Sequence, residues 1–170
     1  MRLSFQRFLR PTSRIASGSL PSSLGALPVG LGRQGDLIVP TADNEAFWVG
    51  LELARAAQPI TLRLSVELRS GDVLDALGAA PSSALTVPPT RHVGGFTHAG
   101  SGLRAFARGG GEDINGCVRL VFRAAILAVE SEPFSTVVRL VDYAGFTAES
   151  GMAPPSPLDP DAGFQGWRLP

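Results

Sequence analysis

The hydrophobic and polar positions alternate most regularly between Pro59 and Leu68. Apolar side chains stand at every second position of this run, and polar ones stand between them. The apolar set is Leu62, Leu64, Val66 and Leu68, and the polar set is Thr61, Arg63, Ser65 and Glu67. Successive side chains of a strand point to opposite faces, so one face of this segment is apolar and the other is polar. The pattern predicts a strand of an antiparallel sheet that packs one face on a core and exposes the other to water.

Similar short apolar runs recur along the chain, roughly ten residues apart, with turn residues between them. We expect strands at 37–39, 46–53, 59–68, 84–87, 91–96, 103–108, 117–129 and 136–143. Between the third and fourth of these, Asp72 is expected to cap one helical turn that ends at Leu77. Roughly six to nine short strands with turns between them predict an all-β fold, either an antiparallel β-sandwich or a jelly-roll-like single domain.

The run from Val118 to Val129 has two interpretations. Its apolar residues are nearly continuous in the second half, and a buried helix produces the same signal as a buried strand. Val and Phe dominate the first half, and Asn115-Gly116 before it is a turn signal. These features favour a strand, and the helix stays the alternative.

Residues 1–35 differ in composition from the segment that follows them, because they contain no acidic residue before Asp36. Their first part interleaves arginines with large apolar residues, and the segment 12–35 is rich in Ser, Gly and Pro. The interleaved residues are Arg2, Leu3, Phe5, Arg7, Phe8, Leu9, Arg10, Arg14 and Ile15. An Arg-rich, acid-free amphipathic start also resembles an organellar transit peptide, so a targeting segment and a mature arm are both open interpretations.

We expect Phe5, Phe8 and Leu9 to lie on one side of a short helix that ends before Pro11. Leucines at 20, 24, 27 and 31 predict that the next segment runs along a surface as extended chain. On this interpretation the arm docks on the outside of the domain. Replacing Phe5 and Phe8 by alanine is then expected to release the arm to proteolysis while the sandwich melts at nearly the same temperature.

The C-terminal segment is again rich in Gly and Pro, but it carries the aromatic residues Phe164 and Trp167. Disordered tails are poor in aromatics, so we expect this one to dock on protein. The predicted organisation is therefore an N-terminal arm at 1–35, a β-sandwich domain at 36–145 and a Pro-rich tail at 146–170.

Half of the chain resembles a family of small, uncharacterised bacterial and fungal β-rich proteins. The resemblance covers residues 37–122 and rests on the order of short motifs after a Val-Pro strand end. These motifs are AFWVGLEL, PITLRL, DALG, VPPTRHVGGF, GLRAFA and NGCVRLVF. The chain departs from the family's pattern after Phe106, at ARGGGEDI. The resemblance implies a β-rich architecture and no activity.

Composition narrows the functional classes. The formal net charge is +0 and charged residues make up only 18% of the chain, so no overall field draws it to nucleic acid or to an anionic membrane. All basic residues are arginine, which reflects either a GC-rich genome or selection for planar, bidentate contacts. The single cysteine, Cys117, excludes an internal disulfide and is expected to be a buried, unreactive thiol.

The most suggestive cluster of side chains for a ligand surrounds a glycine-rich turn at 91–104. It would bind a small molecule or carbohydrate through Arg91, His92, Phe96, His98 and Arg104. Two histidines six residues apart do not match a recognised metal-ligand spacing, so we expect no metal. We also expect no cofactor and no catalytic residue.

Our leading hypothesis from the sequence is a non-enzymatic structural protein, a subunit of a particle such as a capsid or of another oligomer. Its arms would contact neighbouring subunits through Arg2, Phe5, Arg7, Phe8, Arg10, Phe164 and Trp167. The basic arm predicts an acidic or nucleic-acid partner. The alternative is a ligand-binding β-sandwich module that uses the 91–104 loops. The chain has no apolar run long enough for a transmembrane segment and no secretory signal, which favours a cytoplasmic or particle-associated protein.

Overall fold

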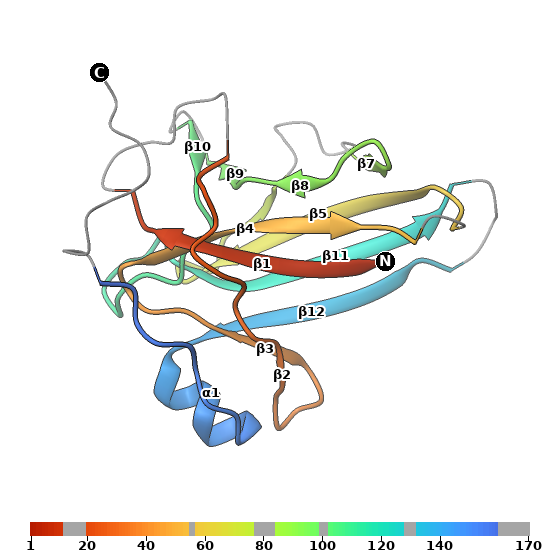
Figure 1. Ribbon diagram of the computed structural model, residues 1–170. Helices are drawn as coiled ribbons and strands as arrows, with labels where there is room; N and C mark the ends of the chain where they lie inside the picture. Colours follow the sequence, from red (N-terminus) through yellow and green to blue (C-terminus); the bar gives the residue numbers. More distant parts are fainter. Residues whose placement is uncertain (12–19, 55–56, 77–83, 99–101, 128–131, 160–170) are drawn as a thin grey trace.

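The computed structural model describes residues 1–11, 20–54, 57–76, 84–98, 102–127 and 132–159, and it consists mainly of β-strands (Figure 1). The elements are β1 (Arg2–Leu9), β2 (Gly30–Leu31), β3 (Leu37–Pro40), β4 (Glu45–Glu52), β5 (Ile60–Leu68), β6 (Val73–Asp75), β7 (Leu85–Val87), β8 (His92–Val93), β9 (Phe96–Thr97), β10 (Leu103–Arg104), β11 (Cys117–Ile126), β12 (Phe134–Val141) and α1 (Tyr143–Ser150). In this part of the chain no helix is both long enough and apolar enough to cross a bilayer.

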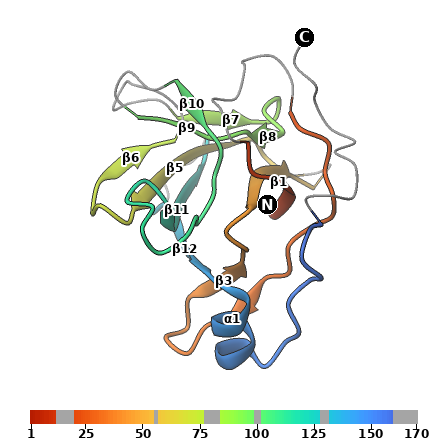
Figure 2. The same ribbon diagram turned by 90° about the vertical axis from the view of Figure 1, so that its left-hand side faces the viewer.

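The strands form two main sheets. The large sheet has the order β2-β3-β12-β11-β5-β6, with β7 also on β5, and the small sheet has the order β1-β4-β8. All pairs in them are antiparallel except β12 with β3, which is parallel. Figure 2 shows β1 and β4 on one side of the molecule and β5, β11 and β12 on the other. The expected all-β, single-domain class is therefore confirmed.

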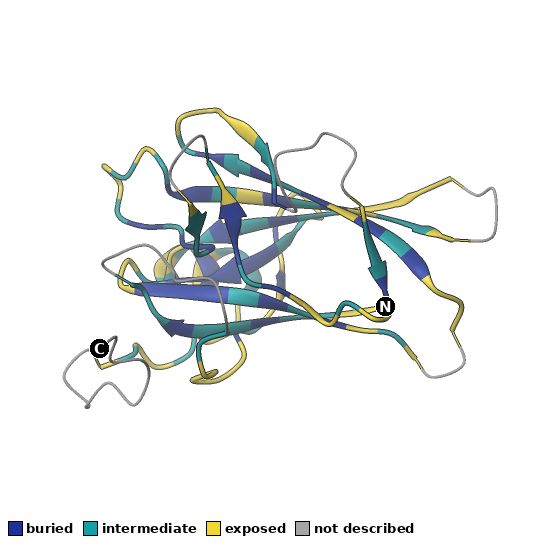
Figure 3. Cartoon of the chain, turned by 90° about the horizontal axis from the view of Figure 1, so that it is seen from above, coloured by how far each residue is buried: buried dark blue, intermediate teal, exposed yellow. Residues whose placement is uncertain are grey.

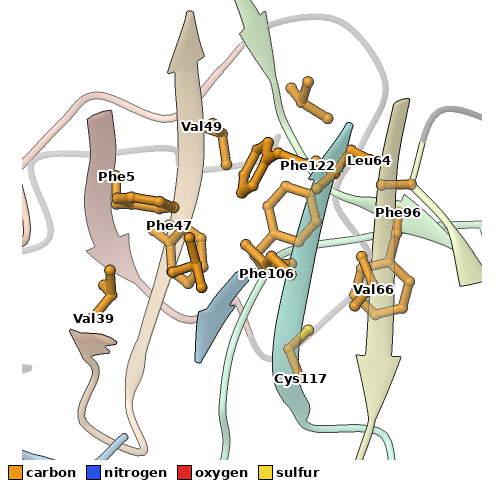
Figure 4. Close-up of a cluster of buried hydrophobic side chains, with 14 of the residues drawn as sticks. Phe5, Val39, Phe47, Val49, Leu64, Val66, Phe96, Phe106, Cys117 and Phe122 are labelled. Atoms are coloured by element: carbon orange, nitrogen blue, oxygen red, sulfur yellow. The ribbon is translucent and has the colours of Figure 1, made fainter. Parts of the chain in front are cut away.

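The core lies between the two sheets, and β5 supplies the row of side chains that its alternation predicts. Its buried residues are Ile60, Leu62, Leu64, Val66 and Leu68. Aromatic rings from both sheets meet this row (Figure 4). The ring of Phe47 lies 5.6 Å from that of Phe5 edge-on and 5.6 Å from that of Phe106 in a stacked pair. Such pairs add to the stability that burial of the rings already provides.

The segment at 118–129, for which the sequence allows a strand or a helix, forms a strand over its first part. β11 pairs with β12 on one side and with β5 on the other, so it lies in the middle of the large sheet. Its buried residues Cys117, Leu120 and Phe122 face the core. The helical alternative for 118–129 is wrong over the described part, which ends at Leu127.

The N-terminal segment is a strand, and the helix expected around Phe5 and Phe8 is wrong. β1 pairs with β4 from Arg2 opposite Glu52 to Leu9 opposite Glu45. Phe5 is 1% exposed and belongs to the main core, so residues 2–9 are built into the domain and do not dock on its outside.

The segment after residue 19 lies along the free edge of β1, as extended chain. Leu27 donates its backbone N–H to the carbonyl of Phe5, and Arg7 donates to Gly25. Leu27 is buried, which confirms that this leucine packs on the domain, whereas Leu24 and Leu31 are exposed. The segment thereby covers part of a strand edge that would otherwise be open to another chain.

Two short elements differ from expectation. Val73–Asp75 forms β6, paired with β5, where a helical turn capped by Asp72 was expected. The Pro-rich tail was expected to begin at residue 146, but residues 146–150 are the second part of helix α1. Asp142 caps α1 by accepting from the N–H of Gly145, and Gly151 ends it in the left-handed conformation.

Helix α1 covers the outer face of the large sheet at β3 and β2. Its Phe146 is fully buried there, and a side chain in place of Gly30 would collide with that ring. Arg139 of β12 ties the helix to the sheet, because it donates two hydrogen bonds, of 2.9 and 2.6 Å, to Glu149 of α1. It donates a third, of 2.8 Å, to Asp36. Helix α1 thus covers the outer face of the large sheet over β2 and β3, whereas Arg63 of β5 and Arg123 of β11 are exposed on the same face.

Candidate functional site

The structure places one member of the predicted ligand cluster at 91–104 in the core. Phe96 is 1% exposed and stacks on Phe106 with 6.0 Å between ring centroids, so it belongs to the core and is not available to a ligand. His92 is exposed in β8, where its ring meets that of Trp48 edge-on at 6.4 Å. Arg91 is exposed, and His98 and Arg104 are half-buried.

The predicted contact residues of the N-terminal arm are mostly used inside the domain. Phe5 and Phe8 are buried, on opposite faces of β1. Arg7 and Arg10 form ion pairs with Glu45 and Asp113, respectively. The exception is Arg2, an exposed residue with Glu52 3.9 Å away. The tail residues Phe164 and Trp167 lie outside the residues that the structure describes.

A buried ionic cluster surrounds Glu45, whose side chain is fully enclosed. Oε1 of Glu45 accepts from Nη1 of Arg7 at 3.2 Å and from the hydroxyl of Tyr143 at 2.7 Å. Oε2 accepts from the N–H of Ala42 at 3.1 Å, and Arg7 also donates to the carbonyl of Ser156 at 2.8 Å. Both carboxylate oxygens accept hydrogen bonds, so the cluster fastens β1, β4, α1 and the following segment together.

The hydroxyl of Tyr143 is held as a hydrogen-bond donor by the same cluster. Burial and the neighbouring Glu45 carboxylate raise the pKa of Tyr143 well above its ordinary value. Within the described residues there is no group of three or more His, Cys, Asp or Glu that could hold a metal ion.

Cys117 is expected to be inert in the folded protein, and this gives a simple test of the core. It is fully buried, and burial raises the pKa of its thiol to about 12. Because the thiolate is the reactive form, a disulfide reagent at neutral pH should modify Cys117 only as fast as the protein unfolds. Absorbance of the released thiol measures this. Complete reaction within minutes in the absence of denaturant would contradict the packing around β11.

The most distinctive surface is at the hairpin end of β11 and β12, where the large sheet extends beyond the small one (Figure 1). The last pair of the small sheet at this end is Arg2 with Glu52. Ile126 and Phe134 point to the same face as the buried Phe122, but the small sheet does not cover them. Phe134 is 70% exposed and Ile126 is 40% exposed, so an inner face of the sandwich is left open to solvent.

Leu127 adds a third large apolar side chain at this end and is 54% exposed. It follows β11 directly, and its N–H donates to the carbonyl of Pro59. We call Ile126, Leu127 and Phe134 the hairpin patch; Figure 3 shows exposed positions at the tips of both strands there. The sequence carries a partial signal for it, because the alternation of apolar and polar residues stops at Ala124 and an apolar run follows.

Comparisons of the chain with protein-family models, with curated proteins and with solved structures find no match. The resemblance over residues 37–122 therefore stays a prediction.

Proposed function

We propose that the protein is a non-enzymatic structural subunit that assembles with further copies of itself through the hairpin patch. The observation that supports this is the 70% exposed ring of Phe134 on a face that is otherwise core. A soluble monomer gains nothing from an uncovered inner face, whereas an oligomer covers it. Large apolar side chains that are exposed together at one end of a domain are typical of protein contact sites.

A second copy of the chain is a fitting occupant for two reasons. The formal net charge is +0, so two copies do not repel each other at long range. In addition, Arg2 and Glu52 are both strongly exposed at the same end of the sandwich. In a contact with two-fold symmetry the same patch is used by both copies, and Arg2 of one copy would meet Glu52 of the other.

The size of the patch indicates a modest affinity. Three large apolar side chains from each of two copies would contribute up to about 10 kcal/mol, because they are already partly buried in the monomer. Association itself costs about 4–15 kcal/mol. The net gain is therefore at most about 6 kcal/mol, so we expect the patch alone to give a dissociation constant of about tens of micromolar at the tightest. The tail residues Phe164 and Trp167, which the sequence predicts to dock on protein, would then strengthen the contact.

The expected result is a concentration-dependent oligomer that one surface substitution dissociates. Light scattering coupled to size exclusion, at tens of micromolar, should give a mass above that of the 17.8 kDa chain. Phe134→Ser should shift the mass toward the monomer, since the lost apolar contact is worth about 1.5–3 kcal/mol at each copy of the residue. The fold should be unchanged because the ring is mostly exposed.

Ile114→Ser is the matched control. Ile114 is 63% exposed and lies in the loop before β11, at the opposite end of that strand from the hairpin patch. The control should keep the mass of the unchanged protein. A wild-type protein that is monomeric at every concentration, or equal dissociation by Ile114→Ser, would refute assembly through this patch.

A further inference from the structure

The open part of the outer face of the large sheet carries two arginines directly opposite each other. Arg63 of β5 and Arg123 of β11 are partners in the register of the two strands, and both are exposed. Directly paired side chains lie about 4.5–5.5 Å apart at Cβ. Two guanidinium groups are thus placed on one face within reach of a single bound group.

Within the described residues, no ion pair joins Arg63 or Arg123, which we call the arginine pair, to an acidic side chain. Like charges directly opposite each other in a sheet are destabilising. Several other arginines are paired with carboxylates, for example Arg7 with Glu45, Arg108 with Asp43 and Arg119 with Glu67. An unfavourable pair kept on an open sheet face points to an anionic group supplied from outside.

The same face shows how such a group is supplied within the chain. Arg139 is the register partner of Arg119 and lies where α1 covers the sheet. There Glu149, on the element packed over the face, accepts both of its hydrogen bonds from Arg139 in a bidentate pair. Paired, planar recognition of a carboxylate is the geometry that arginine favours. A second polypeptide element laid over β5 and β11 would meet the arginine pair in the same way.

The surroundings of the arginine pair suit a polypeptide better than a nucleic acid. The next row of the face carries Val121 and Val137, which are half-buried and opposite each other. They offer a contact for an apolar side chain and match nothing on a phosphate backbone. The chain also has a formal net charge of +0, so no overall positive field attracts a phosphate backbone.

We propose that the outer face of β5 and β11 binds an acidic segment of a partner protein, with Arg63 and Arg123 holding its carboxylates and the valine row holding an apolar side chain. The arginine pair points to the opposite face of the large sheet from Ile126 and Phe134, the two residues of the hairpin patch that lie within strands. Binding of the acidic segment and assembly through the hairpin patch are therefore independent properties.

The test measures binding of a fluorescein-labelled peptide of alternating Glu and Leu by anisotropy at low ionic strength. Arg63→Gln and Arg123→Gln should each weaken binding about three- to tenfold, because each removes one charge-assisted contact. Arg91→Gln is the matched control, since it removes one exposed charge from a different part of the molecule. It should leave the affinity within about twofold of the unchanged protein. Melting temperatures of the Arg63 and Arg123 variants should not fall, because substitution relieves the repulsion between them.

Two further probes separate the alternatives. A peptide of alternating Gln and Leu should bind more weakly than the Glu peptide. Oligo-dT should also bind more weakly than the Glu peptide. Equal affinity for the Gln and Glu peptides would overturn the role of the arginine pair. Tighter binding of oligo-dT that is lost in Arg63→Gln would overturn the acidic-polypeptide assignment in favour of nucleic acid. No binding of the Glu peptide up to about 1 mM would also overturn the proposal.

Discussion

Replacing Phe5 by alanine is expected to lower the free energy of unfolding by about 3–5 kcal/mol. The ring is 1% exposed and lies between the two sheets, with the ring of Phe47 5.6 Å away and that of Phe122 6.4 Å away. Its removal leaves a cavity that partners from both sheets cannot close by small shifts. Guanidinium unfolding followed by fluorescence measures the change.

Arg2→Ala on the same strand is the control for Phe5→Ala. Arg2 is exposed and its pair with Glu52 is long, so the free energy of unfolding should change by less than about 0.5 kcal/mol. The sequence alone predicted the opposite outcome for Phe5, namely release of an arm without loss of domain stability. If Phe5→Ala leaves the unfolding midpoint unchanged and only opens residues 1–11 to protease, β1 is a docked arm and its place in the core is wrong.

The reason why sequence reasoning missed β1 lies in its burial on both faces. Phe5 faces the main core, whereas Phe8 packs on the other face against Ala46 and Ala107. A strand buried on both faces loses the alternation that identified β5. The spacing of Phe5, Phe8 and Leu9 then matched a helix by coincidence, and only pairing with a strand about forty residues away decides between the two.

Helix α1 was missed for a different reason, because its local signals are present in the sequence. Asp142 at the start and Gly151 at the end are ordinary capping residues. Between them, Phe146 is the only buried residue, so the segment has no apolar stripe. What fixes the helix is the contact of Phe146 with the outer face of the sheet and the ion pair between Arg139 and Glu149, and neither is local.

The sequence also predicts only part of the two proposed binding surfaces, the arginine pair and the hairpin patch. The alternation in β5 was enough to place Arg63 on its polar face, and once 117–126 is known to be a strand Arg123 points away from Phe122. The alternation did not place the two arginines opposite each other, because the register between two strands about sixty residues apart is set by the whole sheet. The hairpin patch likewise depends on the unequal lengths of the two sheets, which no stretch of sequence displays by itself.

The Glu45 cluster carries the second large expected effect. Glu45 is the first residue of β4 and its side chain is fully enclosed, and the side chain of its ion-pair partner Arg7, on the neighbouring strand β1, is only 12% exposed. Removing one member of a buried ion pair leaves the other as an uncompensated charge, which is far more costly than losing a surface pair. Among the described residues, Glu45 is the one carboxylate that pairs with Arg7, and Nε of Arg7 has no acceptor at all.

Glu45→Gln is therefore expected to lower the free energy of unfolding by about 3–5 kcal/mol. Glu52→Gln, an exposed carboxylate on the same strand, should change it by less than about 0.5 kcal/mol. Adding Arg7→Met to Glu45→Gln should recover part of the loss, because the stranded charge is removed together with its partner. Chemical unfolding of the two single variants and the double variant gives all three values. Equal effects of Glu45→Gln and Glu52→Gln would mean that water reaches Glu45 and that β1, β4 and α1 are held together by apolar packing alone.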